Sequence, residues 1–458
     1  MSSNRILALM CGVVVMTVID LAIVNTALPS IQSDLRADPA DLQWVVVIYG
    51  IFVAGFLLLG GRLGDLAGHR RVLMAGVAVL AAASLVGGLA GTLEALIAAR
   101  AAQGLGAALA APNALAIISH TFAEGPERNR AMGIFGAAGG SAAAFSSVLG
   151  GLLVQGPGWP WAFFLNVPIG VVLLALVARL PDGQARAQRA RTDVGGAFAL
   201  TLGMMAVAFG VHQTIEHGWL AWASLAPLLG GVALLAGFVG HEGRAAAPLV
   251  PLATLRRPAL VWANVSTGLL WASFLGLIYQ LTLFQQQVQG WSPLASGAAT
   301  LPIAFLSLGV SAAVAPRCVN RIGAARTIAL GLAIMGAGML LLARVPEQAS
   351  YVTDLAPSFV VVGLGLGLAE MAAPLAALAG VRGDEAGLAG GAVETARELG
   401  GSLGLALLVS IALGAAVDGT DAFHRSVLGA AVFAGLGAAV ALVRLDRSAA
   451  GLGRACDG

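Results

Sequence analysis

Long apolar runs follow one another along almost the whole chain, and they constrain its fold more than any other feature. Fourteen runs are each long enough to cross a bilayer as a helix of about 20 residues. The chain is 58% hydrophobic and only 10% charged, whereas a soluble domain carries roughly 25% charged residues. We therefore expect an all-α polytopic membrane protein. The expected spans are 6–29, 43–60, 72–91, 95–119, 131–154, 161–179, 194–213, 221–240, 259–284, 293–315, 326–343, 355–379, 388–414 and 424–443.

The lengths of the connections divide the expected spans into sets of six, two and six. The two longest connections are Leu180–Asp193 and His241–Pro258, and they bracket the seventh and eighth spans. The remaining connections are too short for a soluble domain. We expect an N-terminal six-helix bundle at 1–180, a two-helix linker insert at 181–258, a C-terminal six-helix bundle at 259–445 and a short tail at 446–458.

The distribution of arginine predicts the orientation in the membrane. With the N-terminus in the cytoplasm, the loops on that side hold most of the arginines, while the opposite loops hold only Arg36, Arg344 and Arg425. Positively charged loops stay on the cytoplasmic side. We expect a multi-pass monomer in the cytoplasmic (inner) membrane with both termini inside. The stretch Gly61–Arg71, which reads GRLGDLAGHRR, is then a cytoplasmic loop.

Several functional classes lack any support in this sequence. The three cysteines, Cys11, Cys318 and Cys456, are scattered and suggest neither a metal site nor disulfides. There is no phosphate-binding loop, catalytic triad or cofactor motif. We expect neither an enzyme nor a cofactor nor a metal, and no nucleic-acid partner. The expected partners are a small-molecule substrate, protons and the lipid bilayer.

Six ionisable side chains lie within the expected spans, where a charge is costly and is by default a functional hypothesis. On the first span Asp20 lies roughly 12–14 Å below the outer end, and on the fourth span Arg100 lies roughly 8–9 Å below the same face. These depths are compatible with an ion pair. The pair either only sets the register of two helices, or Asp20 takes up a proton or a cation from outside and competes with Arg100.

The other four ionisable side chains can share one level in the inner half of the membrane. Glu394, Arg397 and Glu398 have i, i+3, i+4 spacing and so lie on one helix face. Two carboxylates that flank one arginine leave a negative charge uncompensated, which favours uptake of a proton or an organic cation. Alternatively, water from the cytoplasm reaches Glu394. The residues assigned to proton coupling are Asp20, Arg100, Glu370, Glu394, Arg397 and Glu398.

The motifs resemble those of the major facilitator superfamily, in particular its fourteen-span drug:proton antiporter branch, over nearly the whole length. The resemblance to its loop motif between helices 2 and 3 departs from the family at Leu66 and His69, where basic residues are usual. In the family this motif holds the two halves together in the outward-facing state. The residues that the resemblance assigns to this conformational latch are Gly61, Gly64, Asp65, Gly68, Arg70 and Arg71.

Other motifs of the family fit fully or in part. Arg100, Gln103, Gly104 and Gly106 resemble the helix 4 motif whose arginine is tied to proton coupling, and Asn166 fits helix 6. The helix 5 motif is partial, because Ser146 and Ser147 stand where antiporters usually have Gly-Pro. Antiport and symport therefore both remain open.

The resemblance implies two six-helix bundles plus two extra transmembrane helices. It also implies proton-coupled export of hydrophobic, cationic drugs or antibiotics by alternating access. The alternative is a proton-coupled transporter, by antiport or symport, of one specific metabolite or natural product. The aromatic members of the expected substrate cavity could instead face lipid. The residues assigned to this cavity are Asn25, Tyr49, Asn113, Asn264, Trp271, Tyr279 and Gln280.

Overall fold

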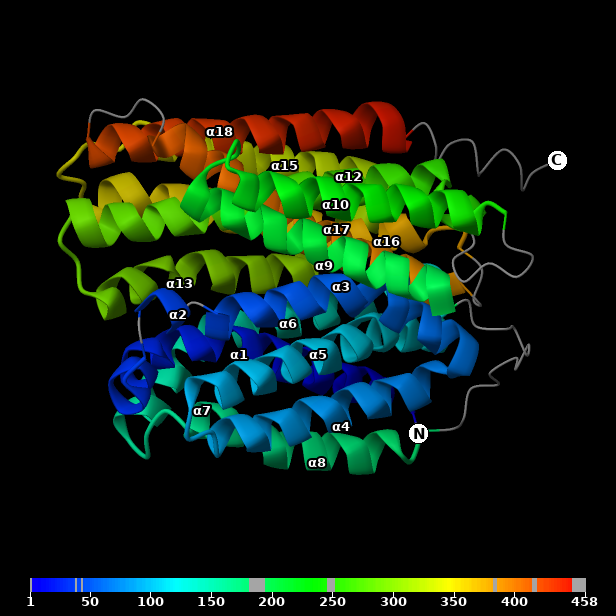
Figure 1. The fold of residues 1–458 in the computed structure, drawn as a ribbon. Helices are drawn as coiled ribbons and strands as arrows, with labels where there is room; N and C mark the ends of the chain where they lie inside the picture. Colours follow the sequence, from blue (N-terminus) through cyan, green and yellow to red (C-terminus); the bar gives the residue numbers. More distant parts are fainter. Residues whose placement is uncertain are drawn as a thin grey trace.

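The long helices lie side by side in one bundle and run roughly parallel or antiparallel to each other (Figure 1). The computed structural model describes residues 2–37, 39–42, 44–180, 194–244, 252–381, 385–413 and 418–446, and these residues include no strand. Helix α1 begins, and helix α18 ends, at the same end of the bundle. The expectation of an all-α membrane fold is confirmed.

The helices divide along the chain into three sets. The first set is α1 (Ser3–Leu35), α2 (Pro39–Leu42), α3 (Trp44–Ala67), α4 (His69–Gly88), α5 (Leu93–Thr121), α6 (Pro126–Gln155), α7 (Trp161–Phe164) and α8 (Asn166–Val177). The second is α9 (Val194–His217), α10 (Trp222–Glu242) and α11 (Leu252–Leu255). The third is α12 (Pro258–Leu283), η1 (Phe284–Val288), α13 (Pro293–Gly309), η2 (Val310–Val314), α14 (Ala315–Ile322), α15 (Ala324–Leu342), η3 (Tyr351–Leu355), α16 (Ala356–Leu378), α17 (Ala386–Leu413), α18 (Gly419–Val440) and η5 (Ala441–Leu445).

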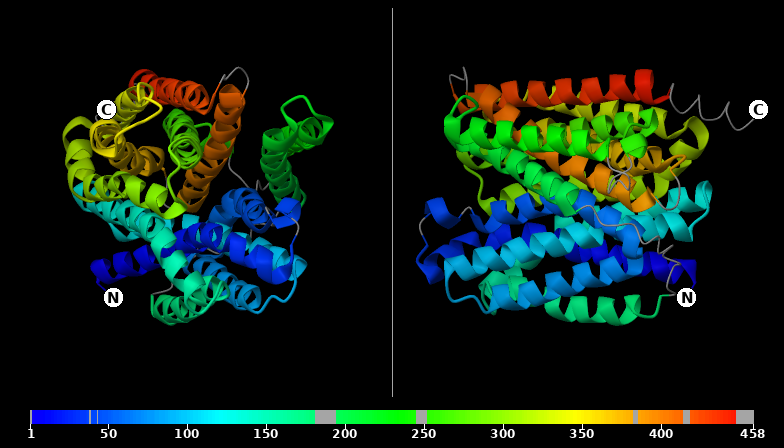
Figure 2. Two further views of the ribbon diagram at one scale, coloured as in Figure 1. Left: turned by 90° about the vertical axis from the view of Figure 1, so that its left-hand side faces the viewer. Right: turned by 45° about the vertical axis from the view of Figure 1, so that its right-hand side comes forward.

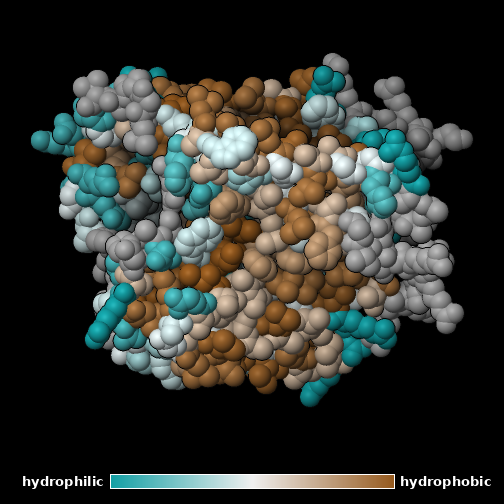
Figure 3. All heavy atoms as spheres, viewed as in Figure 1, coloured by the Kyte–Doolittle hydropathy of each residue, from teal (hydrophilic) through white to brown (hydrophobic). Residues whose placement is uncertain are grey.

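Among the described residues, 12 helical stretches are long and apolar enough to cross a membrane, and Trp161–Val177 is a shorter apolar helix. Helix α6, with 30 residues, runs beside α1. The face shown in Figure 3 carries mostly hydrophobic residues across its middle and hydrophilic residues towards both ends. This pattern is typical of a multi-pass membrane protein. The expected number of fourteen spans stays a prediction.

The first and third sets each pack mainly within themselves. In the first, α5 packs against α3 and α4, and α1 against α6; in the third, α12 packs against α17 and α18, and α15 against α16. Helices α9 and α10 pack against each other and stand to one side (Figure 2). They contact both sets, because Leu200 and Met204 of α9 share an apolar cluster with Leu58 of α3 and Leu388 of α17.

The stretch Gly61–Arg71, expected as a loop, is almost entirely helical. Helix α3 continues to Ala67 and α4 begins at His69, so the chain reverses at Gly68 alone. Gly68 has a φ angle of 97°, which only glycine adopts without strain. We call the first and third sets the two halves of the molecule. The second half repeats this turn at Gly323, which has a φ angle of 85° and lies between α14 and α15. The polar residues of this stretch therefore do not form a loop. The backbone N–H and C=O groups form hydrogen bonds within each helix, and only Gly68 interrupts them.

Reciprocal glycine contacts join equivalent helix pairs in the two halves. A Cβ atom on Gly76 of α4 would lie 2.7 Å from the carbonyl oxygen of Gly106 on α5. A Cβ atom on Gly331 of α15 would lie 2.6 Å from the carbonyl oxygen of Gly365 on α16. Small residues permit such backbone approach in membrane proteins, so glycine is what allows these two helix pairs to pack closely.

We predict that Gly365→Ala destabilises the protein. Alanine gains roughly 0.5–1 kcal/mol over glycine inside a helix, but overpacking a tight contact costs about 1–3 kcal/mol. The matched control is Gly435→Ala on α18, because nothing lies within 4 Å of a Cβ atom there. Thermal unfolding of the purified protein in detergent measures both variants. An unfolding temperature for Gly365→Ala at or above that of Gly435→Ala would contradict this packing.

Candidate functional site

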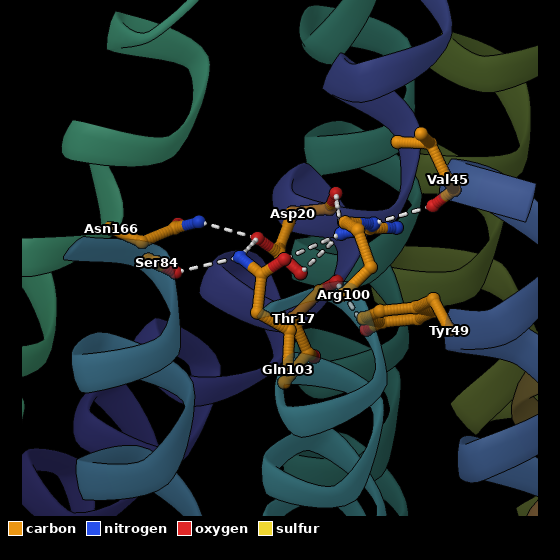
Figure 4. A network of polar contacts seen from close by, with 8 residues as sticks. All are labelled: Thr17, Asp20, Val45, Tyr49, Ser84, Arg100, Gln103 and Asn166. Atoms are coloured by element: carbon orange, nitrogen blue, oxygen red, sulfur yellow. Dashed lines mark hydrogen bonds and ion pairs between the residues drawn. The ribbon is translucent and has the colours of Figure 1, made fainter. Parts of the chain in front are cut away.

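Asp20 and Arg100 form an ion pair in the interior of the first set of helices, as the sequence predicted. Arg100 Nη1 on α5 lies 3.1 Å from Asp20 Oδ2 on α1, and both side chains are fully buried. Arg100 Nε also donates to the carbonyl oxygen of Val45 at 2.9 Å, and its guanidinium lies 4.2 Å from the centre of the Tyr49 ring. The pair thus ties α1, α3 and α5 together (Figure 4).

Neutral polar side chains complete the surroundings of Asp20. Gln103 Nε2 and Asn166 Nδ2 each donate to Asp20 Oδ1 at 2.6 Å. Gln103 Oε1 accepts from Arg100 Nη1 at 3.0 Å, and Gln103 Nε2 also donates to Ser84 Oγ at 2.8 Å. We call Asp20, Ser84, Arg100, Gln103 and Asn166 the Asp20 network. It joins α1, α4, α5 and α8, and every member is fully buried, which makes its hydrogen bonds costly to break.

The acidic residues of α17 and α16 lie around one arginine, as the helical spacing predicted. Arg397 Nη1 is 3.7 Å from Glu394 Oε2, and the Arg397 guanidinium lies 4.0 Å from the centre of the Trp271 ring on α12. Glu370 and Glu398 interact electrostatically with the same arginine. All four charged side chains are half-buried, in contrast to the fully buried Asp20 network.

Asp65 joins the first and third sets of helices at the end of the bundle where α1 begins. Its Oδ1 accepts from the backbone N–H of Gly387 at 2.8 Å, and its Oδ2 accepts from that of Leu388 at 2.9 Å. These amides lie in the first turn of α17, where N–H groups have no partner within the helix. The positive end of the helix dipole also favours a carboxylate there.

The other residues assigned to the latch occupy the same end of the molecule. The backbone of Gly61 contacts that of Gly387 so closely that a Cβ atom on Gly61 would clash, and Gly64 leaves room for the side chain of Asn113. Arg70 Nε donates to the carbonyl oxygen of Val177 at 3.2 Å, so it holds the last turn of α8. Arg71 is exposed.

His69, where the sequence departs from the family, lies inside this contact. Its Nδ1 is 2.8 Å from Asn113 Oδ1, and its Nε2 is 3.5 Å from Asp65 Oδ1. Asn113 Nδ2 donates to the carbonyl oxygen of Gly60 at 2.9 Å. Asn113, which we had assigned to the substrate cavity, therefore supports the Asp65 contact.

A second contact between the halves was missed by the sequence reasoning. Asn129 Nδ2 on α6 donates to Asn320 Oδ1 on α14 at 2.5 Å, and Gly133 leaves room for the backbone of Ser311. Asn320 precedes Gly323 by three residues, as Asp65 precedes Gly68. The stretch Pro316–Thr327, which reads PRCVNRIGAART, has the same place in the last six expected spans as Gly61–Arg71 has in the first six. This correspondence was the signal that could have identified Asn320 as the counterpart of Asp65.

The residues assigned to the substrate cavity do not come together at one place. Tyr49 is buried beneath Arg100, whereas the half-buried Trp271 lies against Arg397. Tyr279 and Gln280 line a cavity of about 380 Å³ at the C-terminal end of α12. Asn264 is half-buried, and its Oδ1 has no hydrogen-bond partner among the described residues. The side chain of Asn25 lies outside the part that the structure describes.

Comparisons with known proteins agree with this architecture. The Major Facilitator Superfamily model matches residues 10–405. The cephamycin export protein CmcT of Amycolatopsis lactamdurans is 38% identical over 440 residues, covering 94% of this chain and 90% of that protein. The puromycin resistance protein pur8 of Streptomyces alboniger is 35% identical over 405 residues, covering 87% and 80%. The crystal structure of the human organic anion transporter MFSD10 superimposes with a TM-score of 0.67 at 15% identity, covering 97% and 99%.

We predict that Asp65→Ala loosens the first turn of α17. Loss of a side chain that caps a helix costs about 1 kcal/mol, so hydrogen exchange at the amides of Gly387 and Leu388 should become about fivefold faster. The matched control is Asp418→Ala, because Asp418 caps α18 within one half of the molecule. Equal exchange rates at Gly387 in both variants and the unaltered protein would rule out Asp65 as the residue that holds α17.

Proposed function

This chain belongs to the major facilitator superfamily, a family of transporters, and we propose that it exports antibiotics or similar drugs in exchange for protons. Two relatives that align over most of their length are named for cephamycin export and for puromycin resistance. Their names and the residues of the Asp20 network together support efflux by this chain.

The observation that carries the proposal of proton coupling is the complete burial of Asp20 beside Arg100. An ionisable pair inside a membrane domain is retained against a high desolvation cost. In the outward-facing state a proton from outside binds Asp20 and weakens its attraction for Arg100. In the inward-facing state the substrate displaces that proton to the cytoplasm. The half-buried acids of α16 and α17 take part in the same exchange.

Alternating access accounts for the position of the contacts between the halves. The Asp65–α17 and Asn129–Asn320 contacts both lie at the end where α1 begins. We infer that this end is cytoplasmic, because most arginines of the loops lie on that side, and that the structure is outward-facing. Rocking of 1–180 against 259–445 would open these contacts, with 181–258 as the insert between the two bundles.

The charges around Arg397 support a cationic substrate. Glu370, Glu394 and Glu398 exceed the single positive charge of Arg397, and Trp271 presents an aromatic face next to them. Aromatic rings attract organic cations. We propose that α12 and α17 supply the main binding residues, in a monomer of the cytoplasmic membrane whose termini are both inside.

One observation favours the transport of a single kind of compound over the transport of many drugs. The relatives CmcT and pur8 are each named for a single natural product rather than for many drugs. The second candidate function is therefore proton-coupled transport of one metabolite or natural product, by antiport or symport. Competition by chemically unrelated compounds for the same transport separates the two candidates.

We predict that Asp20→Asn abolishes proton-driven transport although the protein still inserts. Inside-out vesicles with an acidic lumen should accumulate a fluorescent lipophilic cation, and a protonophore should stop this uptake. The control is Asp34→Asn on the same helix, because Asp34 only accepts from Trp159 Nε1 near the helix end. Unchanged uptake by Asp20→Asn would exclude Asp20 as the coupling residue.

We predict that Glu398→Gln weakens the apparent affinity for cations. Removing one nearby charge should raise the concentration of cation that gives half-maximal uptake by about fivefold to tenfold, with little effect on a neutral drug. Glu347→Gln is the control, because Glu347 is exposed in the connection after α15. An equal rise in the half-maximal concentrations of cationic and neutral drugs would argue against charge recognition at Glu398.

A further inference from the structure

We propose that the side-chain amide of Asn166 rotates by a half-turn when Asp20 takes up a proton. Asn166 then forms a hydrogen bond with Asp20 in both protonation states of the carboxyl group. This inference rests on the proposed role of Asp20 in proton coupling. It assigns Asn166 as a positioning residue, because it acts through Asp20 rather than on the substrate.

The starting point is an unpartnered atom in a fully buried site. Asn166 is the first residue of α8, where the turn at Leu165 separates it from α7 and lets its side chain reach Asp20. Its Nδ2 donates to Asp20 Oδ1 at 2.6 Å, whereas its Oδ1 has no hydrogen-bond partner among the described residues. In Figure 4 the amide approaches the carboxyl group from the side opposite Arg100.

The hydrogen bonds around Asp20 suit only the ionised carboxylate. Gln103 and Asn166 both donate to Oδ1, and Arg100 donates to Oδ2. A protonated carboxyl group has one O–H that must itself donate. In the present arrangement each of these neighbours presents N–H groups to Asp20. Protonation therefore requires that one neighbour present an oxygen instead.

Gln103 is not free to do so. Its Oε1 accepts from Arg100 Nη1, and its Nε2 donates to Ser84 Oγ as well as to Asp20. Turning its amide over would direct an NH₂ group at the guanidinium and lose both contacts. Among the described residues Asn166 has no such second contact, and a half-turn about one bond exchanges its unpartnered Oδ1 with Nδ2. Asn166 is therefore the amide that can respond.

The proton balance is simple. A proton from the solution binds Asp20 Oδ1, and the new O–H donates to Asn166 Oδ1 after the half-turn. Release reverses both steps, so the pair keeps one hydrogen bond in each state. The charged or titratable groups facing Asp20 are Arg100 on α5 and Tyr49 on α3. The packed helices α4 and α8 contribute only the neutral Ser84 and Asn166, and α6 has its charged residues only at its beginning.

Infrared difference spectroscopy of the purified protein in lipid, between acidic and alkaline buffer, tests the inference directly. We expect a carboxylic acid C=O band that Asp20→Asn removes. We also expect a side-chain amide band that shifts with isotope-labelled asparagine and that Asn166→Leu removes. The matched control is Asn4→Leu, because Asn4 is exposed in the first turn of α1 and lies about 24 Å along that helix from Asp20; it should keep both bands.

The pH profile of transport provides the second readout. Asn166→Asp supplies an acceptor but no donor when ionised, so it should favour protonated Asp20. The cytoplasmic-side pH for half-maximal uptake should then rise by about one unit or more. Asn166→Leu loses the hydrogen bond in both states, so its profile should move less while its maximal rate falls. Size-exclusion chromatography checks that each variant is folded.

The possible results separate this inference from the proposed function. A carboxylic acid band that depends on Asp20, without any amide band that depends on Asn166, would overturn the turning amide and retain Asp20 as the proton site. Equal losses of rate in both Asn166 variants with no change in pH profile would also overturn it. Absence of the carboxylic acid band would instead remove Asp20 from proton coupling.

Discussion

The buried ion pair between Asp20 and Arg100 is the interaction on which the first set of helices depends. Either charge alone inside a membrane domain would be prohibitively costly, because no water is available to solvate it. The pair is therefore surrounded by amide and hydroxyl groups from α4, α5 and α8. This requirement fixes how four helices meet, and it confines the proposed proton site to one small volume.

Helix α17 connects that half of the molecule to the other. Its first turn binds the carboxylate of Asp65, and about two turns further on the same helix carries Glu394 and Arg397. A helix is stiff over such a distance, roughly 10–15 Å. A change of charge around Arg397 and the opening of the Asp65 contact therefore act on one rigid element, which suits the coupling of binding to conformational change.

The two contacts between the halves differ in chemistry although they occupy equivalent positions. Asp65 presents a charge to a helix terminus, whereas Asn320 presents a neutral amide to another amide. A charged contact responds to nearby charges more strongly than a neutral one. The contact of Asp65 with α17 is therefore more sensitive to nearby charges than the Asn129–Asn320 contact. His69 lies directly beside Asp65.

The sequence by itself determined the membrane class, the helices and the Asp20–Arg100 pair. Hydropathy, helical rise and spacing are local properties, so depth along a span follows from residue number alone. Only the tertiary structure decided which side chains share a site. Two residues assigned to one substrate cavity lie in different places: Asn113 supports the Asp65 contact, and Tyr279 lines a cavity at the other end of the bundle. The neighbours of a side chain depend on how each helix is rotated and tilted. The oxygen of Asn166 that has no partner among the described residues has the same origin, since packing alone brings Asn166 Nδ2 to Asp20 on α1 and brings no donor to Oδ1.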